Sequence, residues 1–197
     1  VLTTRELAEL LRLFGLDISK MDPTPGDTPF GERSSAGKIF GATGGVMEAA
    51  IRTAHYLITG EELADLEVTA VRGMDDIKEA KVQVGDLTVG VAVASGLGPA
   101  GRLLEQVRAG RDDLHFIEVM TCPGGCIAGG GQPYSTDQIA VRARMQALYK
   151  IDREEKIRTS HANPDVQRLY EEYLGEPLGE KSHHLLHTKY ARREVVH

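Results

Sequence analysis

The two cysteines, Cys122 and Cys126, lie in one short loop and are the residues of this chain best suited to carry chemistry. They stand in the string EVMTCPGGCIAGGGQP, residues 118–133, with Pro-Gly-Gly between them. This spacing allows a tight turn to direct both sulfur atoms to one place, and the glycines permit positive φ and the close approach of a bulky inorganic group. Their N–H groups can donate to a thiolate or sulfide. Three apolar neighbours are expected to exclude water from the site: Val119, Met120 and Ile127.

By themselves, these residues leave three interpretations of the loop open: an iron–sulfur site, a zinc site, and a glycine-rich turn with two buried thiols. Two thiolates do not complete a tetrahedral zinc site or a four-iron site. The tail holds three histidines that could complete a zinc site, but its basic and terminal setting favours solvated side chains: His183, His184 and His187. A disulfide is disfavoured, because disulfide scaffolds spread their cysteines along the chain.

The segments before the loop predict the sheet that positions it. HFIEVM (115–120) is a predicted strand, so Cys122 stands at a carboxyl end, where open α/β sheets build their sites. LTVGVAVA (87–94) is apolar almost throughout, as in a strand covered on both faces. GPAGRLLEQVRAG (98–110) predicts a helix between these strands, so the three form a βαβ unit with a parallel sheet. LEVTAVRG (66–73) is a further strand candidate, and Gly85-Asp86 marks a turn after 82–84.

Helices are predicted on both sides of this unit. The opening string TTRELAELLRLFG has a capping box at Thr3 and Glu6 and a left-handed stop at Gly15. Its apolar stripe consists of Leu7, Leu10, Leu11 and Phe14. GATGGVMEAAIRTAHYLITG predicts a helix over about 46–58.

The part after the cysteine loop is also predicted to be helical. Ser135 and Gln138 resemble a second capping box, which opens a helix to about Lys150. Asn163-Pro164 predicts an N-cap with proline at the first helical position, and that helix should stop at Gly175.

Composition narrows the class of protein. The 197 residues, 41% of them hydrophobic, suit one domain or a large subdomain, and 22 glycines with 5% aromatic residues suit an α/β fold. A formal charge of −6 argues against a nucleic-acid partner. No apolar run reaches the roughly 20 residues of a membrane span. The chain begins with Val1 rather than Met, which indicates a fragment or a processed product, and a cytoplasmic location is the default expectation.

Four strings, in order along the chain, resemble the catalytic domain of the [FeFe]-hydrogenases. TCPGGCIAGGGQP resembles the third cysteine motif of that family, in which a methionine stands two places before the first cysteine, as Met120 does here. IFGATGGVMEAAIRTA (39–54), VLTTRELAELL (1–11) and SHHLLHTKY (182–190) are similar to further stretches of the family. The resemblance implies that residues 1–197 are the C-terminal part of this domain. The expected fold is α/β, a parallel-sheet lobe with flanking helices, and the tail from about residue 176 should wrap or extend.

The resemblance also implies roles for individual residues. Cys122 would ligate a [4Fe-4S] cubane, and Cys126 would ligate the same cubane and bridge to a di-iron subsite. Met120 would pack against that subsite, and Phe40 and Gly41 would line the pocket around its bridging dithiolate. The implied enzyme is a hydrogen:acceptor oxidoreductase that reversibly reduces protons to molecular hydrogen. In this family the di-iron unit carries carbon monoxide and cyanide ligands.

Two other cysteine motifs of the family have no counterpart here. They supply the remaining cubane ligands, the cysteine that shuttles protons and the lysine that contacts a cyanide. The isolated chain is therefore expected to be inactive, and the remainder of the catalytic domain or a partner chain should complete the site. A ferredoxin-like or nicotinamide/flavin subunit is the expected electron partner. The alternative is a relative without significant turnover, either an iron–sulfur assembly factor or a sensory hydrogenase, but the intact FGATGG and CPGGC strings favour the enzyme.

Several other residues have both a functional and a structural interpretation. Glu48 and Glu118 could shuttle protons, but a carboxylate on a helix surface and an ordinary strand residue are the favoured interpretations. Met47 and Met145 are expected in the core. GATGG lacks the lysine of a P-loop and the spacing of a dinucleotide site.

Overall fold

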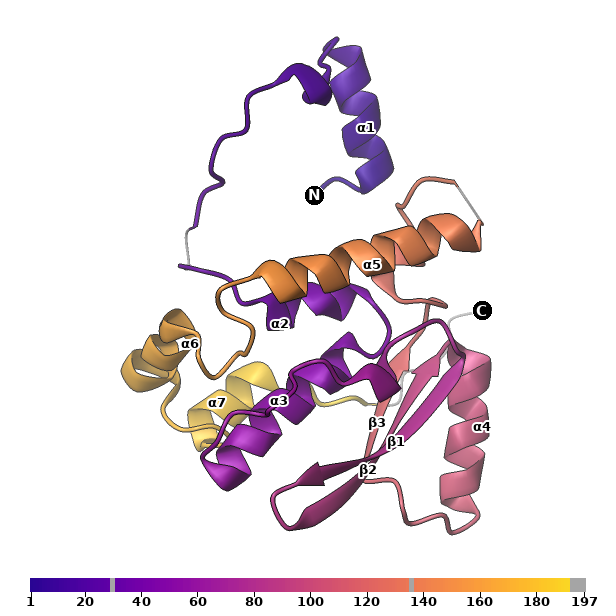
Figure 1. Ribbon diagram of the computed structural model, residues 1–197, viewed down its shortest axis with the longest axis vertical. Coiled ribbons are helices and arrows are strands. Elements are labelled where there is room, and N and C mark those ends of the chain that lie inside the picture. The colour runs from indigo at the N-terminus through magenta and orange to yellow at the C-terminus, as the bar shows by residue number, and fades with distance from the viewer. Residues whose placement is uncertain (29–30, 135–136, 192–197) are drawn as a thin grey trace.

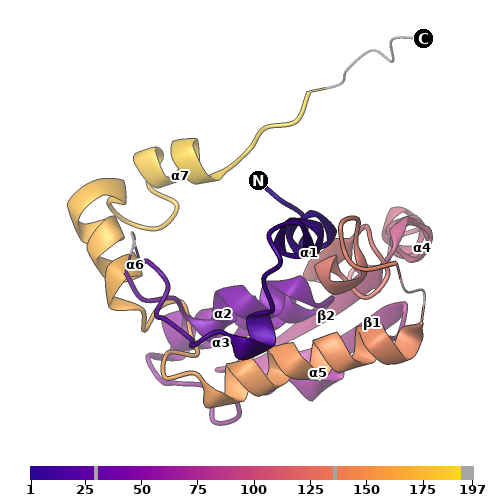
Figure 2. The same cartoon turned by 90° about the horizontal axis from the view of Figure 1, so that it is seen from above.

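The computed structural model describes residues 1–28, 31–134 and 137–191. A small three-stranded sheet is covered by helices on both faces, and a long helix crosses above one end of it (Figure 1). The first helix stands apart from this body in Figure 1, and the chain up to residue 191 extends away from the body in Figure 2. This arrangement is the α/β fold with flanking helices that the sequence predicts.

The sheet has the order β1-β2-β3. β1 (Ile77–Val84) pairs antiparallel with β2 (Leu87–Ser95) through a turn at Gly85, whose φ is +59°. β2 pairs parallel with β3 (Phe116–Met120), and α4 (Leu97–Arg108) makes the crossover. The predicted βαβ unit is therefore confirmed, but the sheet is mixed because its first strand enters through a hairpin.

The strand predicted at 66–73 is wrong. The segment forms a short 3-10 turn at Thr69–Val71, and the first strand begins at Ile77. Val71 is fully buried under helix α3 (Gly45–Thr59), and the next residue, Arg72, reaches the buried carboxylates of Glu48 and Asp152. Val71 is held by packing and Arg72 by ion pairs, and these contacts outweigh the strand propensity of the β-branched residues in this segment.

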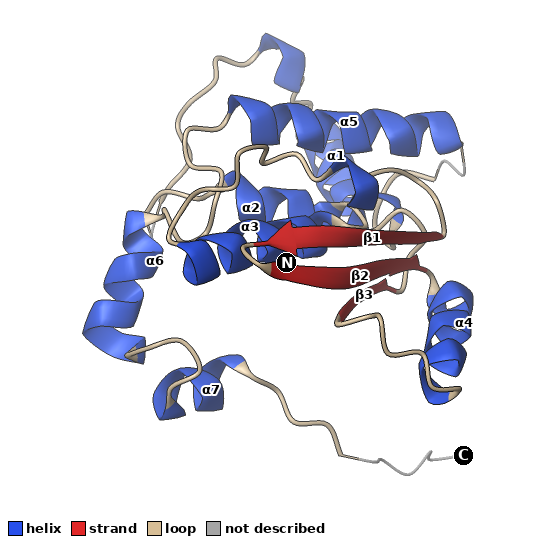
Figure 3. Cartoon of the chain, turned by 60° about the horizontal axis from the view of Figure 1, so that its bottom comes forward, coloured by secondary structure: helices blue, strands red, loops and turns tan. Residues whose placement is uncertain are grey.

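The centre of the sheet is buried on both faces (Figure 3). On one face, α3 (Gly45–Thr59) packs against β2 in an apolar cluster made of Met47, Ile51, Val71, Val91 and Val93. On the other face, α4 packs against the alternate residues of β2 in a cluster made of Ala92, Ala94, Ala100 and Leu103. The prediction that this strand is covered on both sides is confirmed. Burying each large side chain of these clusters contributes about 1.5–3 kcal/mol.

Helix α5 (Gln138–Glu154) lies across α2 (Ser35–Lys38). Its N-cap is Asp137, which accepts a hydrogen bond from the N–H of Ile139, rather than the predicted Ser135, which lies outside the described residues. It also runs four residues beyond the predicted end at Lys150. Its last turn holds Asp152, whose buried ion pairs keep that turn helical.

The remaining C-terminal helices begin and end near the predicted residues. α6 (Pro164–Leu169) starts after Asn163, whose side chain accepts hydrogen bonds from the first turn. One π-helical turn at Tyr170–Leu174 follows and stops at Gly175, where φ is +78°. The short α7 (Glu180–Leu186) comes next, and the chain then extends away from it (Figure 2).

Helix α1 (Thr4–Leu13) has the predicted capping box, because Thr3 and Glu6 exchange hydrogen bonds, and Gly15 has φ of +64°. Its apolar stripe is not packed, however. Among the described residues of this helix none is buried, and Phe14 just after it is 72% exposed. The helix is anchored at its start, where the N–H of Arg5 donates to Gly131 O at 3.1 Å and its guanidinium lies over Tyr134.

Candidate functional site: the cysteine loop

The cysteine loop leaves the carboxyl end of β3, as predicted. The N–H of Gly125 donates to Cys122 O at 2.9 Å and closes a tight turn, and a 3-10 turn over Cys126–Ala128 follows. Gly124 and Gly125 have φ of +84° and +95°, a conformation that residues with a Cβ rarely adopt. Both thiols are free, with Cys122 half-buried and Cys126 exposed. The turn presents two sulfur atoms at the surface of this chain.

A second glycine-rich loop, FGATGG (40–45), interlocks with this turn. The N–H of Thr43 donates to Gly124 O at 3.2 Å. At Gly125 an added Cβ would lie 2.7 Å from Gly41 O and 2.8 Å from the nitrogen of Thr43. The two loops thus touch through their backbones, which only glycine allows at this position. The structure brings the predicted residue Gly41 directly beside the cysteine loop.

This contact predicts the effect of a methyl group at Gly125. Gly125→Ala should lower the free energy of unfolding by about 1–3 kcal/mol, because positive φ and the close approach to Gly41 O both become unfavourable. The control is Gly130→Ala, where an added Cβ meets no atom within 4 Å, and a change within about 0.5 kcal/mol is expected. Chemical denaturation of both variants measures the difference. Equal stability would show that the two loops are not locked together.

The donor set of the loop fits half of a four-iron cubane. The two thiols have three residues between them, and the backbone at Gly129 is so near that an added Cβ would lie 3.4 Å from Cys122 Sγ. A cubane needs four such ligands. In the described part of the chain, no group of three or more His, Cys, Asp or Glu could hold a metal ion. The tail histidines thus form no zinc site with the cysteines there; the rings of His183 and His187 instead stack with centroids 4.4 Å apart.

The expected apolar shield is only partly present. Ile127 is 8% exposed and Met120 is half-buried, in agreement with the prediction. Val119 is 43% exposed in this chain, so its part in the shield stays a prediction. Its strand, β3, lies at the edge of the sheet. Phe40 is similarly open, at 42% exposure.

Helix α5 supports the cysteine loop from the side opposite the sheet. Val141 and Met145 pack against Ala42 and Ile127 in one apolar cluster, which confirms Met145 as a core residue. From the same helix, Arg144 Nη1 donates to Ile127 O at 2.8 Å. The loop is therefore held between the sheet and a helix that comes later in the sequence.

The two glutamates considered as proton carriers are both buried. Glu118 is 6% exposed, and its carboxylate accepts hydrogen bonds from the N–H groups of Gly44 and Met47, each at 2.6 Å. Glu48 is fully buried and pairs with Arg52 and Arg72 at 2.5 and 2.8 Å. The prediction of a surface carboxylate at position 48 is wrong, because its side of α3 turns toward α5.

Sequence reasoning missed three polar residues behind the loop: Lys78, Ser95 and Thr43. The N–H of Gly124 donates to Ser95 Oγ at 2.8 Å, and Lys78 Nζ donates to Thr43 O at 3.0 Å. Local sequence patterns do not point to them, because Lys78 and Ser95 find these partners about 30 positions away in the chain.

The sequence of this chain matches the models of two known protein families. Residues 1–130 match the family of the iron only hydrogenase large subunit, C-terminal domain. The chain belongs to the iron-only hydrogenase family. Residues 138–193 match the iron hydrogenase small subunit, so helix α5, which packs on the cysteine loop, belongs to the part that this second family describes. Membership implies an iron–sulfur cofactor and oxidoreductase chemistry.

Known relatives agree with this assignment. The chain is 49% identical over 195 residues to the NADP-reducing hydrogenase subunit HndD of Solidesulfovibrio fructosivorans, covering 98% of this chain and 33% of that protein. The apo [FeFe]-hydrogenase HydA1 from Chlamydomonas reinhardtii, variant C377H, superposes with a TM-score of 0.73 at 40% identity, covering 94% of this chain and 53% of that one. A cytosolic iron-sulfur assembly component 3 from Rattus norvegicus is 31% identical, covering 100% of this chain and 42% of that protein.

The chain thus spans about a third of the length of its hydrogenase relative and about half of the solved hydrogenase. Within the described residues, no helix is long and apolar enough to cross a membrane.

Proposed function

We propose that this chain supplies two thiolate ligands to a cubane-linked di-iron site at which a longer protein reversibly reduces protons to molecular hydrogen. The observation that carries the proposal is the pair of free thiols in a turn whose glycines lock it against the FGATGG loop. Such a turn holds its sulfur atoms in place before any metal arrives. A preformed site loses less conformational entropy when it binds a cluster.

The individual roles are those that the resemblance to the family implies. Cys122, the more buried thiol, ligates the cubane, and the exposed Cys126 ligates the cubane and bridges to the di-iron subsite. Phe40 and Gly41 lie on the same side, where they line the pocket of that subsite, and Met120 packs against it. When bound, the cofactor supplies the site of hydrogen chemistry and the electron relay. The residues of this chain orient it and keep water away.

The rest of the site lies in parts of the protein outside this chain. Two more cubane ligands and the proton donor come from the remainder of the catalytic domain or from a partner chain, so the isolated chain is inactive. Apolar side chains that are exposed in this chain support the presence of a further part that covers them: Phe40, Val119 and the apolar stripe of α1. Electrons come from a ferredoxin-like or nicotinamide/flavin subunit, and the protein works in the cytoplasm.

The second candidate function is that of an iron–sulfur assembly factor without hydrogen turnover. It is favoured by one observation, the 31% identity to an assembly component along the whole chain. Against it stand the higher identity to the hydrogenase subunit and the intact FGATGG and CPGGC loops.

One experiment separates these functions. The complete protein that contains this chain is expressed with the maturation machinery for the di-iron cofactor and examined by infrared spectroscopy. Carbonyl and cyanide bands together with hydrogen evolution are expected. A four-iron signal without those bands and without turnover would support the assembly factor and contradict our proposal.

A further inference from the structure

A buried lysine and a buried glutamate lie on one row of the sheet directly behind the cysteine loop. Lys78 of β1 and Glu118 of β3 both pair with Val93 of β2, one from each side. Residues that are direct neighbours across strands point to the same face. Both side chains therefore point toward α3, and they are only 5% and 6% exposed.

The glutamate caps helix α3 from another strand. The N-cap Gly44 has no side chain, and the two carboxylate oxygens of Glu118 accept from the N–H groups of Gly44 and Met47. Unpaired N–H groups at a helix start carry partial positive charge, so a carboxylate there is stabilised. Glu118 thereby ties the strand that ends at the cysteine loop to the FGATGG loop.

The lysine holds the other end of the same loop. Lys78 Nζ donates to Thr43 O and to Gly73 O, each at 3.0 Å. Thr43 in turn donates its N–H to Gly124, between the two cysteines. Thr43 therefore links the ammonium group of Lys78 to the backbone of the cysteine turn through two hydrogen bonds.

We propose that Lys78 and Glu118 are positioning residues that hold the two loops together and set, through their opposite charges, the reduction potential of the cluster. This inference rests on the proposed function. Burial lowers the pKa of Lys78, although Glu118 and Asp75 act to raise it. Both hydrogen-bond partners of Lys78 are acceptors, as an ammonium donor requires.

The charges act on the cluster through a poorly screened interior. A cation nearby stabilises the reduced cluster, which carries one more negative charge, and an anion destabilises it. By Coulomb's law, two unit charges about 10–15 Å apart in an effective dielectric of about 20 shift such an equilibrium by roughly six- to seventeenfold. Removing Lys78 should lower the reduction potential, and removing the charge of Glu118 should raise it.

The test uses the complete protein and a redox titration of the cubane followed by electron paramagnetic resonance. At the wild-type midpoint potential, we expect Lys78→Met to decrease the ratio of reduced to oxidised cubane and Glu118→Gln to increase it, each by roughly six- to seventeenfold. Lys78→Arg, which keeps the charge, should restore the wild-type ratio. Lys81→Met on the same strand is the matched control, since Lys81 is exposed and screened by solvent, and no change is expected.

If both variants shifted the ratio of reduced to oxidised cubane in the same direction, or left it unchanged, the proposed effect of the two charges would be wrong. Loosened packing alone would not be expected to shift the ratio in opposite directions. Amide hydrogen exchange in the cluster-free complete protein tests the positioning part even when a variant loads no cluster. Glu118→Gln should speed exchange at Gly44 and Met47, because one amide oxygen cannot replace two carboxylate acceptors. Unchanged exchange there would overturn that part. If the wild-type protein bound no cubane, the proposed function would be wrong. Amide hydrogen exchange at Gly44 and Met47 would still show whether Glu118 positions the FGATGG loop.

Discussion

Replacing Cys126 by alanine in the complete protein is expected to abolish the carbonyl and cyanide infrared bands and to lower hydrogen evolution by more than about 100-fold. Groups that only support a metal ligand already cost about 10- to 100-fold when they are removed, and a thiolate that joins two metal units should cost more. The position of the residue supports this expectation. Cys126 is exposed at the outward end of a turn whose other thiol is half-buried.

Two comparison variants give this result its meaning. Ile127→Val trims the buried neighbour of Cys126 in the same loop and should cost only about 0.5–1.5 kcal/mol of stability while the infrared bands persist. Cys122→Ala should weaken the four-iron signal itself, because in the proposed site Cys122 binds only the cubane. If Cys126→Ala kept wild-type bands and turnover, the bridging role would be wrong.

The second large effect is expected on stability, at a buried network of ions between α3 and α5. Arg52 is fully buried and makes a bidentate ion pair with Asp152, with distances of 2.9 and 2.8 Å. It also pairs with Glu48 at 2.5 Å. Two further arginines donate to Asp152, at 3.2 Å from Arg72 and 3.0 Å from Arg158.

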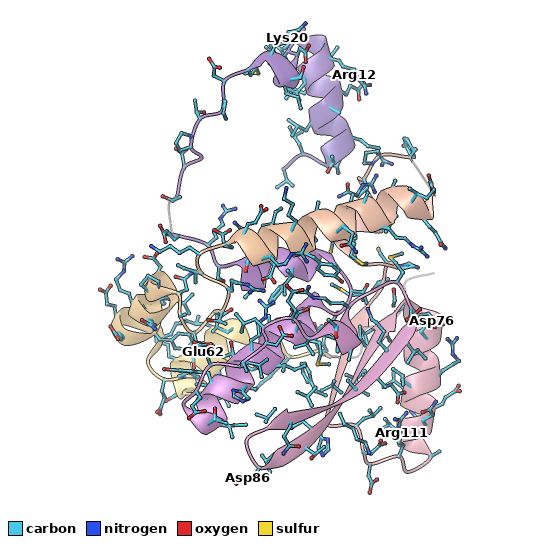
Figure 4. The ribbon with its side chains drawn as sticks, in the orientation of Figure 1. Arg12, Lys20, Glu62, Asp76, Asp86 and Arg111 are labelled. Carbon is cyan, nitrogen blue, oxygen red and sulfur yellow. The ribbon has the colours of Figure 1, made fainter. Side chains whose placement is uncertain are left out.

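Arg52→Ala should lower the free energy of unfolding by about 3–5 kcal/mol. Removing one member of a buried ion pair leaves the partner charges desolvated without compensation. The control is Arg102→Ala, which breaks a 2.5 Å pair with Asp76, a surface residue beside α4 (Figure 4). Exposed pairs of this kind contribute about 0–1 kcal/mol. Denaturant titration of both variants measures the contrast. Similar losses of stability would show that Arg52 contributes no more to the fold than a residue of an exposed ion pair.

The same network determines how stability changes in acid. Burial acts to raise the pKa of Asp152, but hydrogen bonds from Arg52, Ser35 and Arg158 outweigh it and hold this pKa well below its usual range. A carboxyl whose pKa is lower in the folded state stabilises the fold above its unfolded pKa of about 3.9. That contribution is lost as the pH falls below this value. We expect a steeper acid loss of stability in the wild type than in Arg52→Ala, measured by denaturation between about pH 2 and 5.

The contrast between correct and wrong predictions follows the range of the interactions involved. The capping box at Thr3, the N-cap at Asn163 and the stop at Gly175 depend on neighbours within a few residues, and the structure confirms them. The β-branched residues of the segment at 66–73 favour a strand. Its conformation depends instead on residues far along the chain, such as Asp152, which accepts a hydrogen bond from Arg72. The burial of Glu48 likewise depends on Arg72 and α5, which no local pattern reveals.

The sequence by itself determined the βαβ unit, the glycine-rich turn with Cys122 and Cys126, and the family, because periodicity, turn chemistry and motif spacing are local properties. Only the tertiary structure decided that FGATGG interlocks with this turn, that Glu118 caps a helix from another strand, and that Lys78 lies behind the loop. These contacts join residues between about 35 and 80 positions apart in the sequence. Their physical reason is that buried polar groups must find partners wherever the fold brings them together.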